Sequence, residues 1–173
     1  MSTGPCQEAE MTETGQDMRR VERPSRFLWP PVLLAAIVVA AWVAQTIVPL
    51  PWPGVGDTAS RIAGLGLGAA GLLLMIWAVI TLRRAGTTVM PNAAAARLVT
   101  DGPFRYRRNP IYLADMLILL GIAELMRNVW LVLLTPVFGL LVTWLAILPE
   151  EQHLEARFGD AYRANKERTR RLI

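Results

Sequence analysis

The sequence predicts an all-α integral membrane protein with four transmembrane helices and a C-terminal interfacial amphipathic helix. Hydrophobic residues make up 53% of the 173-residue chain and gather in long runs, a composition that is typical of membrane spans and not of soluble domains. Sixteen of the 18 Lys and Arg residues lie in segments 1–26, 83–110 and 149–173, which a four-span topology places on one side. By the positive-inside rule, both termini and the central segment then face the cytoplasm.

The first 26 residues are polar and turn from acidic to basic. They cannot bury a core, so we expect a disordered cytoplasmic tail. Residues 27–50 carry no charge and are long enough to span a membrane, with Trp29 and Trp52 at the ends as interfacial anchors. A cleaved signal peptide is the alternative, because residues 41–44 (AWVA) have small side chains at suitable spacing. The length of the apolar run favours an uncleaved span.

Prolines and glycines between residues 49 and 56 are too dense for a helix to continue. The second apolar run covers residues 62–82, and its glycines Gly64, Gly68 and Gly71 recur at helical spacing on one face. Their missing side chains let another helix approach closely, from this chain or from a second copy, so the oligomeric state stays open. The GLGLG string in this run is similar to a nucleotide-binding fingerprint, but no strand precedes it, which favours packing.

Segment 83–110 is the longest internal polar stretch, and two apolar runs follow it at 111–126 and 129–148. Only an Arg-Asn pair separates these runs, so we expect an antiparallel hairpin. The first run is short, because about 16 residues extend about 24 Å, less than a hydrocarbon core of about 30 Å. We expect it to start within the interface or to depend on its neighbours. Residues 27–148 then form the transmembrane domain, with 83–110 as a cytoplasmic loop.

The last segment, 149–173, is amphipathic. Leu154, Phe158 and Tyr162 recur every fourth residue, and most of the remaining face is basic. This pattern predicts a helix that lies against the cytoplasmic membrane face, with Gly159 as the expected place of a break.

Charge and cysteine content limit the partners. The net charge is +4, but the basic residues stand between apolar runs, so the expected anionic partner is membrane lipid and not nucleic acid. Cys6 is the only cysteine, so one chain can form neither a disulfide nor a cysteine-built metal site, and we expect no metal. Lipidation of Cys6 is an alternative to an inert tail cysteine.

The stretch with the clearest chemistry is GPFRYRRNPIY, residues 102–112. It interleaves three arginines with two aromatic residues: Arg105, Arg107, Arg108, Phe104 and Tyr106. Cationic donors and flat rings side by side are suited to an anionic ligand that carries a ring. The arginines are equally explained as the cytoplasmic flank of a membrane helix.

A second group follows about forty residues later, where Glu150 and Glu151 come after Pro149. Proline and acids in a first turn are an ordinary helix start. However, the topology puts this pair and the 105–112 stretch at the same end of the hairpin, so we expect them to lie close together. Carboxylates, arginines and rings in one place could hold an ammonium or sulfonium, a carboxylate and a purine.

Together with Phe158-Gly159 and Tyr162, these two groups resemble the isoprenylcysteine carboxyl methyltransferase and phospholipid methyltransferase superfamily. The resemblance covers about residues 98–171. It implies a bacterial inner-membrane enzyme that uses S-adenosylmethionine and methylates a small lipophilic or lipid acceptor at the cytoplasmic face, with 149–173 completing the cofactor site. The cofactor-binding residues that it implies are Arg97, Leu98, Val99, Phe104, Arg108, Asn109, Pro110, Ile111, Tyr112, Glu150 and Glu151.

The sequence departs from the family pattern Arg-His-Pro-x-Tyr-x-Gly at two places. Asn109 replaces the histidine and Ala114 the glycine. Asparagine still hydrogen-bonds but does not titrate, which puts a proton-transfer role at this position in doubt. Ala146 stands where the prenylcysteine enzymes have a substrate-binding arginine, which argues against a prenylcysteine carboxylate as substrate.

The mechanism that the resemblance implies is direct in-line methyl transfer, for which the protein aligns the reactants and excludes water. His153, the only histidine, lies one turn beyond Glu150 and is a possible base, although an interfacial helix residue is the simpler explanation. Asp115 is the second catalytic possibility, because a charge within a span needs a partner or water.

Two other functions remain open. Sterol reductases resemble this family, so a nicotinamide-dependent membrane reductase is one alternative, although the chain is short for it. A non-catalytic membrane protein of the same fold that binds a lipid or a partner is the other.

Overall fold

The computed structural model describes residues 30–53, 57–86 and 98–172. Within these ranges the regular elements are helices. One isolated parallel β-bridge pairs Arg107 with Arg170. The all-α prediction is confirmed. The expected polar tail, the Trp29 anchor and Arg97 of the expected cofactor site lie outside the described residues.

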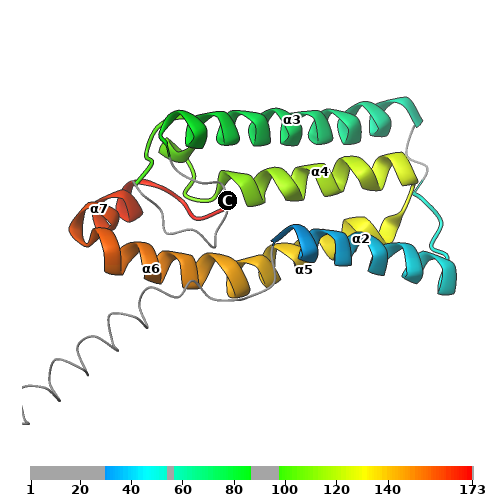
Figure 1. Ribbon diagram of the computed structural model, residues 1–173. Helices are drawn as coiled ribbons and strands as arrows, with labels where there is room; N and C mark the ends of the chain where they lie inside the picture. The colour runs from blue at the N-terminus through cyan, green and yellow to red at the C-terminus, as the bar shows by residue number, and fades with distance from the viewer. Residues whose placement is uncertain (1–29, 54–56, 87–97, 173) are drawn as a thin grey trace, which may run out of the picture.

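Each predicted apolar run contains a helix (Figure 1). In chain order the elements are α2 (Pro30–Ile47), α3 (Asp57–Arg84), the 3-10 turn η1 (Gly102–Arg105), α4 (Pro110–Met126), α5 (Val129–Val142), the π turn η2 (Thr143–Ile147), α6 (Leu148–Phe158) and α7 (Asp160–Arg168).

Three helical segments are long and apolar enough to cross a membrane, namely Pro30–Ile47, Thr58–Arg84 and Val129–Phe158. Helix α4 has 17 residues and is the short member of the hairpin, as its length in the sequence predicts, because it pairs with the continuous 30-residue segment Val129–Phe158. Large apolar side chains cover the outer faces of α2, α3 and α5, which a soluble protein would avoid. The structure is therefore that of a helical membrane protein, and the count of four spans stays a prediction.

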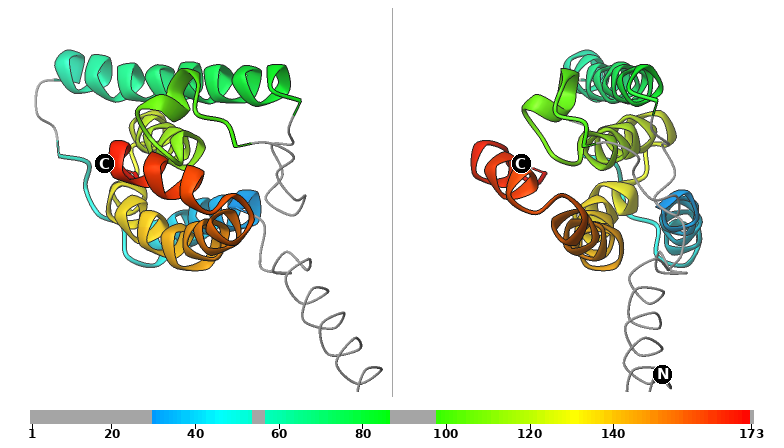
Figure 2. Two further views of the ribbon diagram at one scale, coloured as in Figure 1. Left: turned by 90° about the vertical axis from the view of Figure 1, so that its left-hand side faces the viewer. Right: turned by 60° about the vertical axis from the view of Figure 1, so that its left-hand side comes forward.

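The helices are arranged in the order α3, α4, α5 and α2, with α4 between α3 and α5 (Figures 1 and 2). The core lies between α2, α4 and α5, and its fully buried side chains include Leu119, Leu131, Phe138 and Val142. Helix α3 is packed along α4, so α4 has neighbours on two sides and is the element best placed to carry a buried site.

Glycines form the closest contacts between α3 and α4. A Cβ atom on Gly68 would lie 2.9 Å from the Cα of Gly121, and one on Gly71 would lie 2.8 Å from the carbonyl oxygen of Ala114. Real Cβ atoms do not come so close to backbone, so these positions need glycine for the two helices to touch. The glycine face is thus used within the chain, and the GLGLG string is helical packing as predicted.

The Arg-Asn turn between α4 and α5 closes the antiparallel hairpin at the end away from η1. The Asn128 side chain caps α5 by accepting a hydrogen bond from the Leu131 N–H at 3.4 Å, and its amide donates to the Ala41 carbonyl of α2 at 3.1 Å. One buried side chain therefore ties α2 to the hairpin.

The helix of the last apolar run does not end at Leu148, where the apolar residues stop, but continues through the polar residues to Phe158. A proline inside a helix removes a hydrogen bond and collides with the carbonyl four residues earlier, which for Pro149 is that of Leu145. The π turn η2 spans this carbonyl, and the Leu148 N–H donates to the Thr143 carbonyl five residues back. This wider turn lets the helix pass the proline.

Beyond Phe158 the helix breaks at Gly159, as predicted, where φ is +50°. Helix α7 then turns back, and residues 169–172 run towards the start of α4, where Figure 1 marks the C-terminus. The last segment is therefore two helices and a returning strap, in place of one interfacial helix.

Candidate functional site

The predicted ligand loop is held against the end of α3. Gly102 has φ +58°, and a Cβ atom there would lie 2.7 Å from Thr81 Oγ1 of α3. Pro110 is the first residue of α4 and Asn109 precedes it as the N-cap, a usual arrangement because Pro lacks the N–H that a first turn cannot use. The loop therefore enters α4 at a fixed angle.

The two groups predicted from the sequence, the 105–112 stretch and the acidic pair Glu150 and Glu151, are in contact. Arg108 Nε donates to Glu151 Oε1 at 3.1 Å, across 43 residues of sequence. The side chains are only 10% and 6% exposed, so the ion pair is largely shielded from water and less screened than a surface pair. This contact confirms that the 105–112 stretch and the acidic pair lie side by side.

A third residue, Arg171, completes this ion pair, and the sequence did not single it out. Arg171 Nε lies 3.1 Å from each carboxylate oxygen of Glu151, and one Nη lies 2.7 Å from Oε2. The hydrogen bond with Glu151 raises the pKa of Arg171 above its ordinary value. Arg171 was expected only as part of a basic helix face, because its spacing does not distinguish it from the neighbouring basic residues.

Backbone groups of α7 and of the returning strap add to the contact. Arg108 Nη1 donates to the carbonyls of Lys166 at 2.9 Å and Thr169 at 2.6 Å, and the Arg108 N–H donates to the Arg170 carbonyl at 3.0 Å. The amide of Asn109 is 3.5 Å from the Arg171 carbonyl, at the limit of a hydrogen bond. We call Arg108, Glu151, Arg171 and the backbone they hold the C-terminal clamp.

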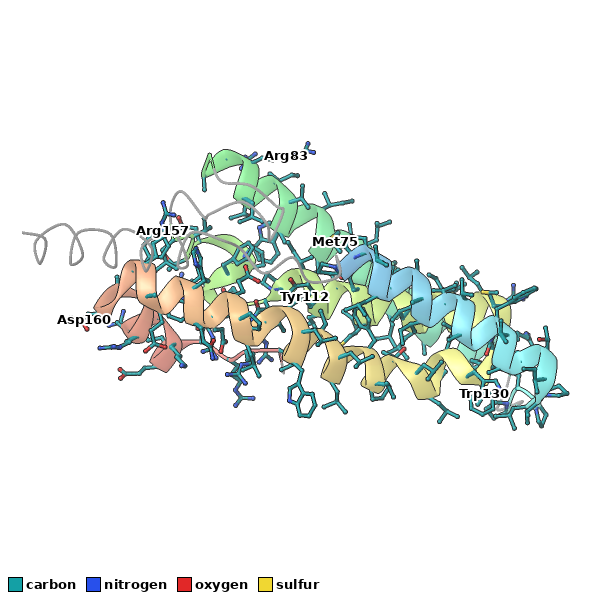
Figure 3. All side chains as sticks on the ribbon, turned by 60° about the horizontal axis from the view of Figure 1, so that its bottom comes forward. Met75, Arg83, Tyr112, Trp130, Arg157 and Asp160 are labelled. Atoms are coloured by element: carbon teal, nitrogen blue, oxygen red, sulfur yellow. The ribbon has the colours of Figure 1, made fainter. Side chains whose placement is uncertain are left out.

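Two further carboxylates lie near the clamp without belonging to it. Tyr112 on α4 is buried, and Asp115 of α4 and Glu150 of α6 both interact with it electrostatically. Neither Asp115 nor Glu150 has a hydrogen bond or ion pair with another described residue. In Figure 3 the labelled Tyr112 lies on α4 beside α6, within the bundle. The structure thus separates the acidic pair into Glu151, which the arginines neutralise, and Glu150, which they do not.

Tyr162 of α7 was predicted as part of an apolar stripe and as one of the residues that carry the family resemblance. It is 2% exposed, and its hydroxyl has no hydrogen-bond partner among the described residues. Burial raises the pKa of this hydroxyl to about 12, and nearby charges on Glu150, Glu151, Arg108 and Arg171 also act on it. The hydroxyl therefore stays protonated at neutral pH and is available as a donor.

The other predicted residues are less constrained. Leu98, Val99, Phe104 and Ile111 are half-buried, and Pro110 is buried at the start of α4. His153 is half-buried on α6 and has no hydrogen bond or ion pair with another described residue. The roles of all these residues in binding or proton transfer stay predictions.

The fold and this charged end of the bundle define a helical membrane protein with buried ionisable groups on α4, α6 and α7. Comparison with protein families gives a match to phospholipid methyltransferase over residues 59–161, more than half of the chain. The chain therefore belongs to the phospholipid methyltransferase family, and the resemblance drawn from its motifs is confirmed. Comparison with curated proteins and with solved structures gives no match.

The family match includes Arg108 and Glu151 but ends one residue before Tyr162. Whatever Tyr162 and Arg171 do has to be argued from the structure.

Proposed function

We propose that the protein is an integral-membrane, S-adenosylmethionine-dependent methyltransferase that acts on a small lipophilic or lipid acceptor at the cytoplasmic membrane face. Family membership supports the reaction class. The observation that carries the proposal is the buried contact between Arg108 and Glu151. It places the loop of the family motif against the helix that bears Glu150.

The residues at this end fit such a cofactor. S-adenosylmethionine presents an ammonium and a sulfonium, a carboxylate and a purine. Glu150 and Asp115 are half-buried carboxylates without an ion-pair partner among the described residues, so a cationic ligand group would offset the cost of their partial desolvation. Tyr112 and Phe104 supply rings near the same loop. Glu151 is already neutralised by arginines, and we assign it to holding the site together.

S-adenosylmethionine, when bound, supplies an activated methyl group that transfers directly to a nucleophile. The protein has to hold donor and acceptor in line and exclude water, which accounts for much of the barrier reduction in such reactions. Packing of α4 between α3 and α5 and the clamp over the loop fix the residues that would do this.

The proton requirement depends on the acceptor. A carboxylate needs no base, a thiol reacts as thiolate, and an amine has to be uncharged. His153 and Asp115 are the residues proposed for such a proton transfer, since Asn109 cannot titrate. Asn109 instead serves to orient the loop through its amide.

The proposed location is the bacterial cytoplasmic membrane, with both termini in the cytoplasm. The distribution of basic residues supports this orientation. Exposed apolar side chains on α2, α3 and α5 support lipid contact, and a lipophilic acceptor would enter from the bilayer without crossing water.

Calorimetry of the protein in detergent tests the proposal with S-adenosylhomocysteine, the product form of the cofactor. We expect binding by the unmodified protein and at least a tenfold loss in Glu150→Gln, which keeps the shape and removes the charge, and in Tyr112→Ala, which removes the ring. Arg163→Ala, on the exposed face of α7, is the control and should bind normally.

The same titration separates the alternatives. Binding of NADPH in place of S-adenosylhomocysteine would establish a reductase. Binding of neither would leave a non-catalytic lipid- or partner-binding protein and refute the methyltransferase.

A further inference from the structure

Helix α3 packs on α4 with one side and is exposed on the other. Large apolar side chains recur on the exposed side at helical spacing as the helix approaches its end: Leu73, Ile76, Trp77 and Ile80. The last turn then carries Arg83 and Arg84, both exposed, and Arg84 follows Trp77 by seven residues, which puts these two on one face. Figure 3 shows Arg83 at the end of α3, outside the bundle. An apolar stripe that ends in cations has the same order as a phospholipid, with its chains and then its phosphate.

The turn η1 adds a third arginine beside this end of α3. Gly102 approaches α3 so closely that a Cβ atom there would lie 2.7 Å from Thr81 Oγ1 and 3.3 Å from Trp77 Nε1. Residues three apart in a 3-10 helix eclipse one another, so Arg105, the last residue of η1, lies on the side of η1 that faces α3. We call four residues the α3–η1 surface: Trp77, Arg83, Arg84 and Arg105.

The α3–η1 surface offers hydrogen-bond donors that have no acceptor in the described fold. The side chains of Arg83, Arg84 and Arg105 are exposed and form no ion pair or hydrogen bond with another described residue. The indole N–H of Trp77 likewise has no acceptor among the described residues. Asp101, the acidic residue that precedes η1, is exposed, and its side chain does not cap the turn. Three arginines therefore stand against one aspartate, and the surface attracts anions.

The position of Arg105 is explained neither by the helix end nor by the clamp. Arg83 and Arg84 complement the dipole at the C-terminus of α3, but Arg105 belongs to another element and is brought there by the packing of η1 on α3. The clamp is held by Arg108, which donates to Glu151 and to carbonyls of α7 and the strap. Arg105 is thus available to a ligand on the α3 side of the loop.

We propose that the α3–η1 surface binds the phosphate of an anionic phospholipid in the cytoplasmic leaflet, with an acyl chain along the apolar stripe of α3. The arginines match the charge of the phosphate, and the stripe is continuous with the exposed apolar side of the helix. A soluble phosphate would use the arginines alone. The site is distinct from the proposed methyl-transfer residues and does not depend on them. A headgroup held by Arg105 would fix the loop three residues before Arg108.

The test titrates phosphatidylglycerol into the full-length protein in detergent and follows the Tm, with phosphatidylcholine of the same chain length as the neutral comparison. A ligand that binds only the folded protein raises the Tm, so we expect phosphatidylglycerol to act at a lower concentration than phosphatidylcholine. Arg84→Gln combined with Arg105→Gln should need about ten times more phosphatidylglycerol for the same shift, because each basic residue adds to the attraction of an anionic lipid. The response to phosphatidylcholine should not change.

Two further variants control for net charge. Arg163→Gln combined with Arg168→Gln removes the same charge from the exposed face of α7 and should leave the response to phosphatidylglycerol unchanged. Asp101→Asn removes the acid beside the surface without loss of a side-chain cap, and it should lower the concentration of phosphatidylglycerol that is needed. Equal weakening in the two arginine pairs would mean that only net charge matters and would overturn the inference.

Glycerol phosphate, which has the phosphate and no acyl chains, is the last probe. We expect no shift in Tm at concentrations where phosphatidylglycerol saturates, because the probe leaves the stripe of α3 uncovered. An equal shift with glycerol phosphate, or equal action of the two phospholipids on the unmodified protein, would refute an anionic-lipid site. Binding of S-adenosylhomocysteine tests the proposed function separately, and its failure would leave this inference intact.

Discussion

The α3–α4 interface and the C-terminal clamp join segments of one bundle by opposite means. At α3–α4 the glycines bring two backbones into contact, with Gly68 facing Gly121, and the attraction is close packing. At the clamp, two arginines and a glutamate are buried together through hydrogen bonds. The α3–α4 interface is therefore sensitive to added side-chain atoms, whereas the C-terminal clamp is sensitive to the loss of a charged group.

The largest effect is expected at the clamp. Glu151→Ala leaves Arg108, which is 10% exposed, as a buried cation without its carboxylate, and losing one partner of a buried pair costs about 3–5 kcal/mol. Thermal unfolding in detergent, followed by tryptophan fluorescence, should show a clearly lower Tm.

Arg171→Ala is the matched variant, because it leaves the Arg108–Glu151 pair in place and Arg171 is the more exposed of the two arginines. Its loss of stability should be smaller than that of Glu151→Ala. An equal or larger loss would show that the strap, and not the buried charge, dominates the clamp.

The next effect is expected at the glycine interface. Gly68→Ala puts a methyl group 2.9 Å from the Cα of Gly121, and backbone on both sides cannot give way. Overpacking of this kind costs about 1–3 kcal/mol. The measurement is the Tm and the yield of monodisperse protein.

Gly66→Ala is the control for that substitution, since a Cβ atom on Gly66 would meet nothing within 4 Å. It should be neutral or slightly stabilising, because alanine is the better helix former by about 1 kcal/mol. If both variants lost stability equally, the close approach of α3 to α4 would not be the cause.

A smaller effect is expected for Asn128, which ties α2 to the hairpin by polar contacts at the opposite end from the clamp. Asn128→Ala loses the cap of α5 and the bond to the Ala41 carbonyl, at about 1 kcal/mol. Asn128→Ser keeps a cap acceptor and loses the amide donor without adding a charge at this buried position, so its Tm should fall between those of the unmodified protein and Asn128→Ala. A Tm that falls in the order Asn, Ser, Ala checks this assignment.

The smallest effect is expected for Arg163→Ala on α7. Its pair with Glu155 resembles the clamp in chemistry, but Arg163 is 63% exposed, and solvent screens such pairs. No measurable change in Tm is expected. A drop comparable with that of Arg171→Ala would mean that burial does not set the strength of ion pairs at this end of the bundle.

The contrast between helix packing and the long-range ion pairs of the clamp also explains which features the sequence could predict. The helical runs, the short hairpin member, the glycine face and the break at Gly159 follow from local pattern, and the structure has all of them. The meeting of the 105–112 stretch with the acidic pair follows from topology, because both are at one end of the hairpin.

The rest depends on tertiary contact. Arg171 stands among several similar basic residues, and only the return of the chain after α7 selects it for Glu151. Pro149 signals a helix start in the sequence, whereas in the structure a π turn accommodates this proline and the helix continues past it. The sequence does not indicate that the Tyr162 hydroxyl lacks a hydrogen-bond partner, because this depends on which side chains surround it in the folded protein.

The strap also sets an order of events during synthesis. Chains grow from the amino end, so α2 to α6 leave the ribosome before Arg171 does. The membrane helices can therefore be inserted while Glu151 and Arg108 still lack their third partner. Assembly of the charged site is in this way postponed until the lipid-facing part of the protein is already in place.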